Sequence, residues 1–306
     1  MATKETPEFS VVIVAYNHAK YIAMAIESVL QQTYQDFEII VLDDGSTDNI
    51  HEIVLSFPDS RVKYFYQENS GLPACARNKG ISLSKGRYIA LLDGDDFWHK
   101  DKLDKCRQIL NDMPQVGLVC HNEAIIHGNK ILRYTSYGPH VDQMYKKLLL
   151  DGNCLHTSAV VIRRSIFFDD ALRFCEEKNL FTIEDYEYWL RLAMRFRFYF
   201  ILDVLGYYRV TETGAFLRST EVNALNMLSL LDSHFSKFGH QDKDLLERIR
   251  KRRSSVMCAA GRAFHHKNNF EESKEWYKKS ICEYPFNYKA VIGYLAALLK
   301  LRIMYR

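Results

Sequence analysis

Short apolar runs alternate with stretches of helical periodicity over the first 112 residues, and this alternation strongly limits the possible folds. Residues 9–16 and 37–42 are continuous apolar, β-branched runs. Such runs suit strands that are buried on both faces of a parallel sheet. Between them, apolar residues recur at helical spacing from Tyr21 to Leu30, with Asn17 as the expected helix cap. The pattern predicts an α/β fold with a mostly parallel sheet and helices on both faces.

Two of the predicted strands end abruptly in acidic loops. Residues 37–42 lead into Asp43 and Asp44, and residues 87–92 lead into the sequence Asp-Gly-Asp-Asp at 93–96. Ligands of open parallel sheets bind beyond the carboxyl ends of the strands. Acidic side chains this close together also repel one another unless a cation compensates them. Both loops are therefore expected at one edge of the sheet, around a ligand site.

The rhythm of the sequence changes twice along the chain. After residue 115 a predicted hairpin is followed by mixed strands and helices, ending in an aromatic strand at 198–209. Beyond residue 220 strand signals disappear and helical segments remain. We therefore expect an α/β domain at 1–220 and a helical region at 221–306. Within that region, residues 258–285 resemble part of a tetratricopeptide helix pair, although no second copy is visible.

Composition narrows the class of protein further. The net charge of +3 over 306 residues does not indicate a nucleic-acid partner. The seven cysteines are odd in number and never form a CxxC pair, which favours a reducing compartment. The sequence shows neither a signal-peptide pattern nor the roughly 18 uninterrupted apolar residues of a membrane span. We expect a cytoplasmic protein.

Asp93 and Asp95 form the clearest chemical motif. Both carboxylates can project toward one oxygen-ligated divalent cation, Mn²⁺ or Mg²⁺, that would also hold the phosphates of a bound nucleotide diphosphate. Gly94, between them, leaves space for a close backbone approach. The alternative is a turn in which Asp95 or Asp96 caps the following helix, and a short Asp-x-Asp motif alone favours that alternative.

Five sequence blocks, in order and at suitable spacing, reverse that preference. They begin with Ser10-Val-Val-Ile-Val-Ala-Tyr-Asn17 and continue through residues 25–33, 37–48, 76–80 and 88–96. Together they resemble the family 2 inverting glycosyltransferases of the Rossmann-like GT-A fold, of the type that builds bacterial capsule and O-antigen polysaccharides. The resemblance implies transfer of a sugar from a nucleotide-sugar to an acceptor hydroxyl of a growing glycan.

The same resemblance implies a donor-binding role for several residues at the strand ends. Ala15, Tyr16 and Asn17 would line the nucleotide, together with the 93–95 motif. Asp44 would accept a hydrogen bond from the N3–H of a uracil base, so a UDP-sugar is the expected donor. Arg77 would approach the phosphates, where a guanidinium makes charge-assisted bonds. The structural alternatives are a turn for Asp44 and a surface ion pair for Arg77.

Glu184 and Asp185 stand at the start of a predicted helix. Acidic residues there also complement the helix dipole, which is the structural alternative. By resemblance, Asp185 is the catalytic base and Glu184 supports it. Direct displacement at the anomeric carbon requires the acceptor hydroxyl to lose its proton, and a positioned carboxylate can take it. The metal would stabilise the departing diphosphate.

Trp98 and His156 are the acceptor-side candidates. Trp98 follows the metal motif and is expected either to face the sugar or acceptor or to pack in the core. His156 precedes a strand that resembles the acceptor-side segment of the family, although a lone histidine is more often structural.

The end of the late strand departs from the family. Many relatives place a histidine there, shortly after a Tyr-Arg pair, where it reaches the metal or phosphates. This chain has Val210 and Thr211 instead. Either Glu212, Thr213 or Arg218 makes that contact instead, or the ion is held by fewer protein ligands.

Basic amphipathic segments at 248–253 and 288–306 predict contact with the inner surface of an anionic membrane. The resemblance adds a lipid-linked acceptor, because many similar enzymes elongate lipid-linked glycans. The alternative is a solvated helix face that packs its apolar side on the α/β domain.

Two other functions are compatible with an α/β nucleotide-binding domain. A nucleotidyltransferase should carry a glycine-rich phosphate loop after the first strand, which residues 15–19 lack. A non-catalytic nucleotide-sugar binder would not need both acidic motifs, the one at residues 93–96 and the one at residues 184–185. The presence of both motifs argues against such a binder.

Overall fold

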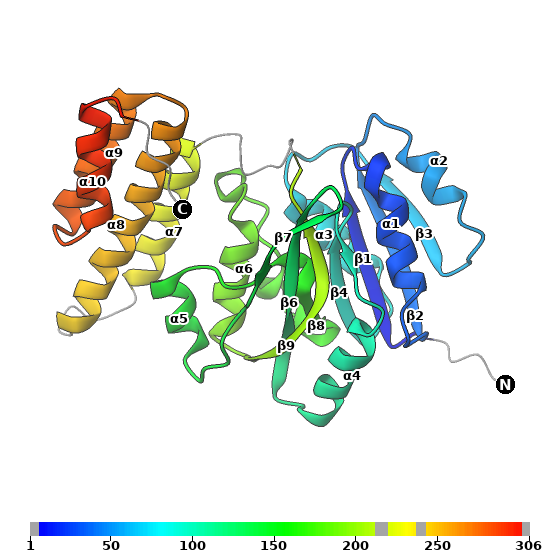
Figure 1. Ribbon diagram of the computed structural model, residues 1–306. Coiled ribbons are helices and arrows are strands. Elements are labelled where there is room, and N and C mark those ends of the chain that lie inside the picture. Colours follow the sequence, from blue (N-terminus) through cyan, green and yellow to red (C-terminus); the bar gives the residue numbers. More distant parts are fainter. Residues whose placement is uncertain (1–5, 212–219, 237–242, 302–306) are drawn as a thin grey trace. The chain divides into compact units, whose positions relative to one another are not determined.

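The computed structural model describes residues 6–211, 220–236 and 243–301. The chain divides into two compact units (Figure 1). One unit comprises Met1–Tyr145 and Cys154–Glu212, and the other comprises Lys146–Asn153 and Thr213–Arg306.

The described part of the first unit contains one mixed, mostly parallel sheet of nine strands. The strands β3, β2, β1 and β4 lie side by side in that order and are parallel. Strand β8 lies between β4 and β6 and is antiparallel to both, and β9 pairs with β6 in parallel. Strand β5 pairs with β9, and β7 pairs with β6, both in antiparallel fashion. The bounds are β1 Phe9–Ala15, β2 Phe37–Asp44, β3 Val62–Gln67, β4 Tyr88–Asp93, β5 Phe97–Trp98, β6 Val116–His127, β7 Lys130–Thr135, β8 Val160–Arg163 and β9 Arg197–Arg209.

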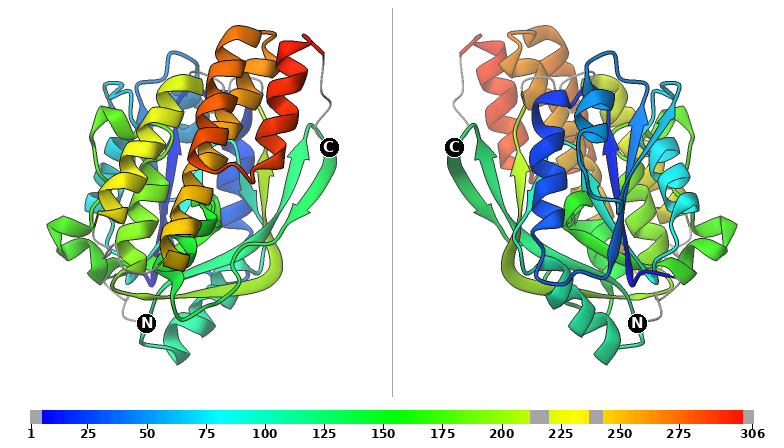
Figure 2. Two further views of the ribbon diagram at one scale, coloured as in Figure 1. Left: turned by 90° about the vertical axis from the view of Figure 1, so that its left-hand side faces the viewer. Right: turned by 90° about the vertical axis from the view of Figure 1, so that its right-hand side faces the viewer.

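Helices cover both faces of this sheet (Figures 1 and 2). Val11 and Ile13 of β1 pack in one core cluster with the buried face of α1. Val12, between them, faces the other way, where a Cβ on Gly80 of α3 would lie 2.4 Å from its Cγ1 atom. Coverage on both sides explains why the strand is continuously apolar. The helices of this unit are α1 Ala19–Leu30, α2 Ile50–Leu55, α3 Pro73–Leu83, α4 Lys102–Asp112 and α6 Glu184–Ala193, whereas most of α5 Met144–Asp151 belongs to the second unit.

The start of α1 differs from the prediction. Asn17 does not cap the helix, because it adopts a left-handed φ of 55° and its Oδ1 accepts the N–H of Thr47 at 2.8 Å. The first helical N–H, that of Ala19, instead donates to Asp48 at 2.8 Å. Asn17, which the sequence assigns to the helix cap, therefore joins the loop after β1 to the loop after β2 at the carboxyl edge of the sheet.

The second unit is helical in its described part, with α7 Thr220–Phe235, α8 Lys243–His266, α9 Phe270–Glu283 and α10 Tyr288–Leu298. Tyr277 of α9 is fully buried between two glycines. An added Cβ would lie 2.8 Å from its ring at Gly261 of α8 and 2.3 Å at Gly293 of α10, so the three helices pack closely around this one side chain. Among the described residues, no helix is long and apolar enough to cross a bilayer.

Candidate active site

The two acidic loops lie at the same edge of the sheet. In the β1–β2 ladder Ala15 pairs with Asp43, and in the β1–β4 ladder Val14 pairs with Asp93. The carboxyl ends of β2 and β4 therefore flank the end of β1, as predicted from the strand pattern.

Arg77 joins this edge to the acidic pair at the start of α6. Its Nη2 donates to Asp93 Oδ1 at 3.2 Å and its Nη1 donates to Glu184 Oε1 at 3.0 Å. The residue is 6% exposed, so it does not form a surface ion pair. Burial opposes its charge, but Asp93 and Glu184 outweigh that effect and raise the pKa of Arg77. One charged guanidinium thus holds together groups from α3, β4 and α6.

Asp185 is half-buried beside this bridge. Its Oδ1 accepts the N–H of Tyr186 at 2.6 Å, which restrains the carboxylate at the helix start. Burial and the neighbouring Glu184 raise the pKa of Asp185 to about 6, against the opposing charge of Arg77. A carboxylate that titrates near neutral pH can both hold and accept a proton under working conditions, as a general base must.

Three side chains are placed so that they could hold a metal ion, and only one of them, Asp93, was predicted as a ligand. Asp93, Asp96 and His156 offer ligand atoms that all lie within 4.8 Å of one another. Asp96 is fully buried, and it accepts the Ser158 hydroxyl at 2.6 Å and the Arg209 N–H at 2.8 Å. Asp95 is not part of this group in the described chain and stays a predicted ligand.

The chemistry of these groups fits a divalent cation. Carboxylate oxygens with an imidazole nitrogen suit Mn²⁺, and carboxylates suit Mg²⁺. Burial raises the pKa of Asp96 well above its usual range, and the Asp95 charge adds to that shift. Burial and the Asp93 charge likewise raise the pKa of Asp95. Because both anions are disfavoured, a cation bound among them would relieve a real electrostatic cost.

His156 lies inside this acidic cluster. Its Nδ1 is 3.0 Å from Glu123 Oε2, which also accepts the Tyr137 hydroxyl at 2.8 Å. Burial disfavours the imidazolium, but Glu123 and Asp96 raise the pKa of His156 to about 10. His156, which the sequence assigns to the acceptor side, thus lies beside the acids of the candidate metal site.

Asp44 and its neighbours lie at the end of β2. Asp44 Oδ1 accepts hydrogen bonds from the Gln67 amide and from the Ser70 N–H and hydroxyl. Within the described chain, Oδ2 accepts only a long bond of 3.3 Å from the same hydroxyl. The adjacent Asp43 closes the turn by accepting the Ser46 N–H at 2.8 Å. Among the other predicted nucleotide contacts, Ala15 is buried, and Tyr16 and Asn17 are exposed at the strand end.

Gly94 is buried where the acidic loop at residues 93–96 crosses the end of β1. Its N–H donates to Val14 O at 2.8 Å, and an added Cβ would lie 2.9 Å from that of Ala15. A side chain here would push the acidic loop away from β1, which agrees with the space predicted at this glycine.

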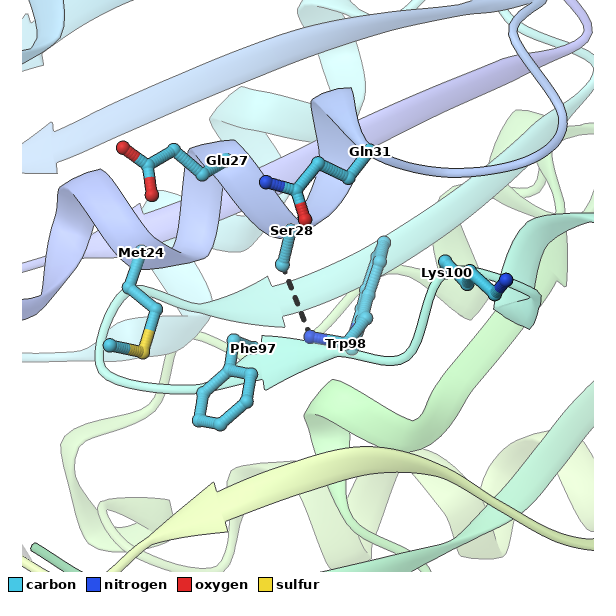
Figure 3. A pocket seen from close by; sticks show the side chains of 7 residues that line it. All are labelled: Met24, Glu27, Ser28, Gln31, Phe97, Trp98 and Lys100. Atoms are coloured by element: carbon cyan, nitrogen blue, oxygen red, sulfur yellow. Dashed lines mark hydrogen bonds between the residues drawn. The ribbon is translucent and has the colours of Figure 1, made fainter. Parts of the chain in front are cut away.

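The structure favours the packing alternative for Trp98. The residue is 4% exposed, and its indole N–H donates to Ser158 O at 2.8 Å. The Lys102 ammonium lies 3.4 Å from the ring centroid. Figure 3 shows the other side of this segment, a small pocket where the backbone N–H of Trp98 bonds Ser28 Oγ. None of the acidic site residues lines that pocket.

Sequence reasoning missed the residues that support the acidic cluster. Ser158 bridges Asp96 and the backbone N–H of Asp93, while Lys102, whose pKa burial lowers to about 7, donates to Ser158 O at 2.7 Å. One signal was present for Glu123, because it closes a run of three polar residues inside the buried strand β6. Glu212, Thr213 and Arg218, the alternative metal or phosphate contacts, lie outside the described residues.

Proteins of similar sequence are glycosyltransferases. The model of glycosyl transferase family 2 matches residues 10–168. An uncharacterised glycosyltransferase of Rickettsia typhi is 32% identical over 247 residues, which cover 76% of this chain and 72% of that protein. In relatives from three further Rickettsia species, the match spans only 16% to 26% of the relative's length.

Solved structures share the fold. TarS 1-349 of S. aureus, in complex with UDP-GlcNAc, superposes with a TM-score of 0.59 at 17% identity, covering 95% of this chain and 90% of that one. The mannosyltransferase PcManGT of Pyrobaculum calidifontis, in complex with GDP-Man and Mn²⁺, gives a TM-score of 0.57 at 16% identity, covering 97% and 86%. The predicted GT-A architecture with added C-terminal helices is confirmed.

Proposed function

The chain belongs to glycosyl transferase family 2 and is a glycosyltransferase, and from that premise we propose that it moves a sugar from a UDP-sugar to an acceptor hydroxyl of a growing glycan with inversion at the anomeric carbon. We assign the reaction to residues 1–220. The observation that carries the proposal is the Arg77 bridge between Asp93 and Glu184. It joins the phosphate end of the site to the acidic pair that supplies the base.

Asp185 is the proposed base. As the acceptor oxygen forms its bond to the anomeric carbon, its proton passes to the Asp185 carboxylate, and the bond from that carbon to the diphosphate breaks with UDP as the leaving group. This single displacement forms no covalent intermediate, so an α-linked donor gives a β-linked product. The pKa of about 6 lets Asp185 be ionised at neutral pH and still accept a proton.

Asp93, Asp95 and Asp96 are the proposed carboxylate ligands of Mn²⁺ or Mg²⁺. When bound, the cation would stabilise the charge of the departing diphosphate. Arg77 stays charged beside Asp93 and holds that carboxylate in place, in addition to any contact it makes with the donor phosphates.

The surroundings of Asp44 suggest which nucleobase the donor carries. A uracil presents one N3–H to a carboxylate, whereas a guanine presents an N1–H and an amino group side by side. Asp44 Oδ1 is already bonded by Gln67 and Ser70, which leaves Oδ2 as the oxygen better able to accept a new bond. One available oxygen suits uracil better than guanine. The similar folds of TarS and PcManGT are known with UDP-GlcNAc and GDP-Man respectively, so the base has to be tested.

A panel of UDP- and GDP-sugars tests the proposal, with Mn²⁺ present and donor hydrolysis, thermal stabilisation and product configuration as readouts. We expect UDP to raise the melting temperature, a UDP-sugar to be consumed and the product to be inverted. Preference for a GDP-sugar would contradict the donor assignment, and a retained anomeric configuration would contradict the displacement mechanism.

We also propose that the C-terminal helices contact an anionic membrane surface, where a lipid-linked acceptor would lie. One face of α10 is packed through Ala290, Gly293 and Ala297. The opposite face is apolar and at least 36% exposed at every position, namely Tyr288, Val291, Ile292, Leu295, Leu298 and the cap residue Leu299. Exposed apolar side chains at this spacing are typical of helices that lie in a membrane interface.

Charge selects the partner for that face. Residues 284–306 contain no aspartate or glutamate, and residues 213–306 carry seventeen Lys and Arg against nine Asp and Glu. Lys289 and Lys300 are exposed beside the apolar face. Anionic headgroups therefore complement this surface better than a second copy, which would bring like charges together.

Flotation with vesicles tests the membrane contact. We expect binding to vesicles rich in phosphatidylserine, weak binding to neutral vesicles, and loss of binding in Ile292→Glu and Leu295→Glu. Leu202→Glu, at an exposed apolar position on β9, is the matched control and should bind normally. Concentration-dependent dimerisation that Ile292→Glu abolishes, without vesicle binding, would assign the face to a second copy instead.

A further inference from the structure

We propose that Arg87, Arg163 and Arg164 form a binding site for a phosphate group, at the edge of the sheet opposite the candidate active site. The three side chains line one hollow of about 290 Å³, together with Ser165 and Phe168. This is far more room than the roughly 10–15 Å³ that one water molecule needs. The inference does not depend on the metal or on the transferase mechanism proposed above, because none of the residues assigned to them lines the hollow.

The hollow lies at the amino end of β4, whereas the acidic loop lies at its carboxyl end. Arg87 directly precedes Tyr88, the first residue of β4, and Tyr88 pairs with Arg163 at the end of the antiparallel strand β8. Strand β4 runs over six residues to Asp93. A strand of this length spans roughly 17 Å. A phosphate group in the hollow is therefore separate from the diphosphate of a donor bound at the acidic loop.

The three arginines come together without a counter-charge. No carboxylate lines the hollow, and within the described residues none of the three guanidinium groups forms an ion pair. Other arginines of the same unit are paired with aspartate or glutamate, namely Arg61, Arg77, Arg107, Arg173, Arg191 and Arg195. Clustered like charges repel one another, so an anion in the hollow would relieve that repulsion.

The backbone holds these charges close together. The Arg164 N–H donates to Arg87 O at 3.0 Å, next to the pairing of Tyr88 with Arg163. The guanidinium carbon atoms of Arg87 and Arg163 lie 5.2 Å and 5.6 Å from the centroid of the same Tyr88 ring. Because like charges on adjacent strands destabilise a sheet, this arrangement has a cost that a bound anion would offset.

Neutral oxygen atoms orient two of the guanidinium groups and leave their other donors available. Arg87 Nη1 donates to Asn111 Oδ1 at 3.3 Å, and Arg164 Nη1 donates to Ser84 O at 3.3 Å. Within the part of the chain that the structure describes, these are the only hydrogen bonds of the two side chains. The Nε–H and Nη2–H groups of each therefore remain for a ligand. This pair of parallel donors is the fork that binds two oxygens of one phosphate.

Arg163 also has a structural role. Its Nε donates to Val116 O at 2.7 Å and its Nη2 donates to Met113 O at 3.0 Å, beyond the end of α4. A cation near the carboxyl end of a helix also complements the helix dipole. Arg87 and Arg164 do not make such contacts in the described chain, so these two residues are the ones to substitute.

The donors suit a phosphate group better than a carboxylate. A phosphate monoester carries a charge of about −1.5 to −2 at neutral pH and three strong acceptor oxygens. Two guanidinium forks, the third positive charge and the Ser165 hydroxyl match that charge and number of oxygens, whereas one carboxylate would leave much of the positive charge uncompensated. The phosphate group can belong to a small soluble ester or to a lipid headgroup, because both present the same oxygens.

Calorimetry of the full chain with inorganic phosphate, in the absence of divalent cations, tests the site without relying on activity. We expect saturable binding in the wild type and a loss of about 10–100-fold in Arg87→Gln and in Arg164→Gln, the usual effect of losing a hydrogen bond between charged groups. Arg164→Lys should recover only part of this loss, because it keeps the charge without the fork. Arg133→Gln is the matched control: it removes an exposed arginine of β7, outside the hollow, and should bind phosphate like the wild type.

Glycerol 3-phosphate and vesicles that contain phosphatidic acid distinguish the two sources of the phosphate group. Vesicle flotation is carried out in Leu295→Glu, so that the proposed contact through α10 does not contribute. Binding of glycerol 3-phosphate that Arg87→Gln and Arg164→Gln weaken would identify a soluble ester. Vesicle binding that both substitutions weaken, without binding of glycerol 3-phosphate, would identify a lipid headgroup.

Two results would overturn the inference. One is that inorganic phosphate, glycerol 3-phosphate and the vesicles all fail to bind the wild type. The other is that Arg87→Gln and Arg164→Gln bind phosphate as the wild type does, which would place the anion elsewhere. Should Arg164→Gln fail to fold, Arg87→Gln and Arg164→Lys provide the same comparison. Both outcomes leave the transferase proposal intact, because UDP binding with Mn²⁺ is measured separately and should be the same in these variants as in the wild type.

Discussion

Replacing Asp185 with asparagine removes a proton acceptor while keeping the shape of the side chain, and so tests the proposed base directly. The Oδ1 atom that accepts the Tyr186 N–H remains in Asn, so the start of α6 should be preserved. Turnover should fall on the order of 10²–10⁴-fold, the usual contribution of a positioned general base. UDP affinity should barely change, because the side chain acts on the acceptor hydroxyl.

The pKa of Asp185 adds a quantitative signature. Burial and Glu184 raise it to about 6, and only the ionised form can accept the proton. The rate of the wild type should therefore rise as pH increases through 6 and level off above it. At pH 5 about one tenth of the carboxyl groups are ionised, so the rate should be about tenfold below the plateau. The small residual rate of Asp185→Asn should lack this acid limb.

The assay is initial-rate kinetics from pH 5 to 8 with saturating Mn²⁺ and donor, alongside calorimetry with UDP for each variant. Asp170→Asn, at an exposed aspartate away from the bridge, is the control and should show wild-type kinetics. Wild-type turnover in Asp185→Asn would refute its role as base. An unchanged acid limb in that variant would assign the titration to another group.

Three further results are expected. Asp95→Ala, or chelation by EDTA, should remove nearly all transfer without unfolding the protein, because the substitution also removes the repulsion between Asp95 and Asp93, and near-normal turnover would contradict the metal ligand assignment. Asp44→Ala should weaken UDP binding by roughly 1–3 kcal/mol, and calorimetry that finds GDP tighter than UDP would contradict the uracil assignment. Arg77→Met should lower the free energy of unfolding by about 3–5 kcal/mol, since Asp93 and Glu184 lose their buried counter-charge, and a denaturation midpoint equal to that of the wild type would show that the bridge contributes little.

The regular elements of the α/β unit could be predicted because their signals are local. Strand β1 is buried at every position and apolar at every position except Ser10, since helices cover both its faces, and the acidic residues that end β2 and β4 follow directly in the sequence. Helix caps were less predictable. Asparagine is a residue type that often caps helices, but the left-handed backbone of Asn17 at the end of β1 directs its side chain to Thr47. Asp48, from another loop, accepts the first N–H of α1 instead.

The support of the metal site could not be predicted in the same way, because it depends on pairings between distant segments. Asp96 meets Ser158 and Arg209 only after β8 and β9 have joined the sheet next to β4 and β6. Nothing in the spacing of these residues along the chain indicates that contact. The chain did carry a weaker signal in β6, where Glu123 closes a run of three polar residues in a buried strand whose other residues are mostly apolar. A charge in a strand covered on both sides must have a partner, and here that partner is His156 from a distant segment, whose Nδ1 lies 3.0 Å from Glu123 Oε2.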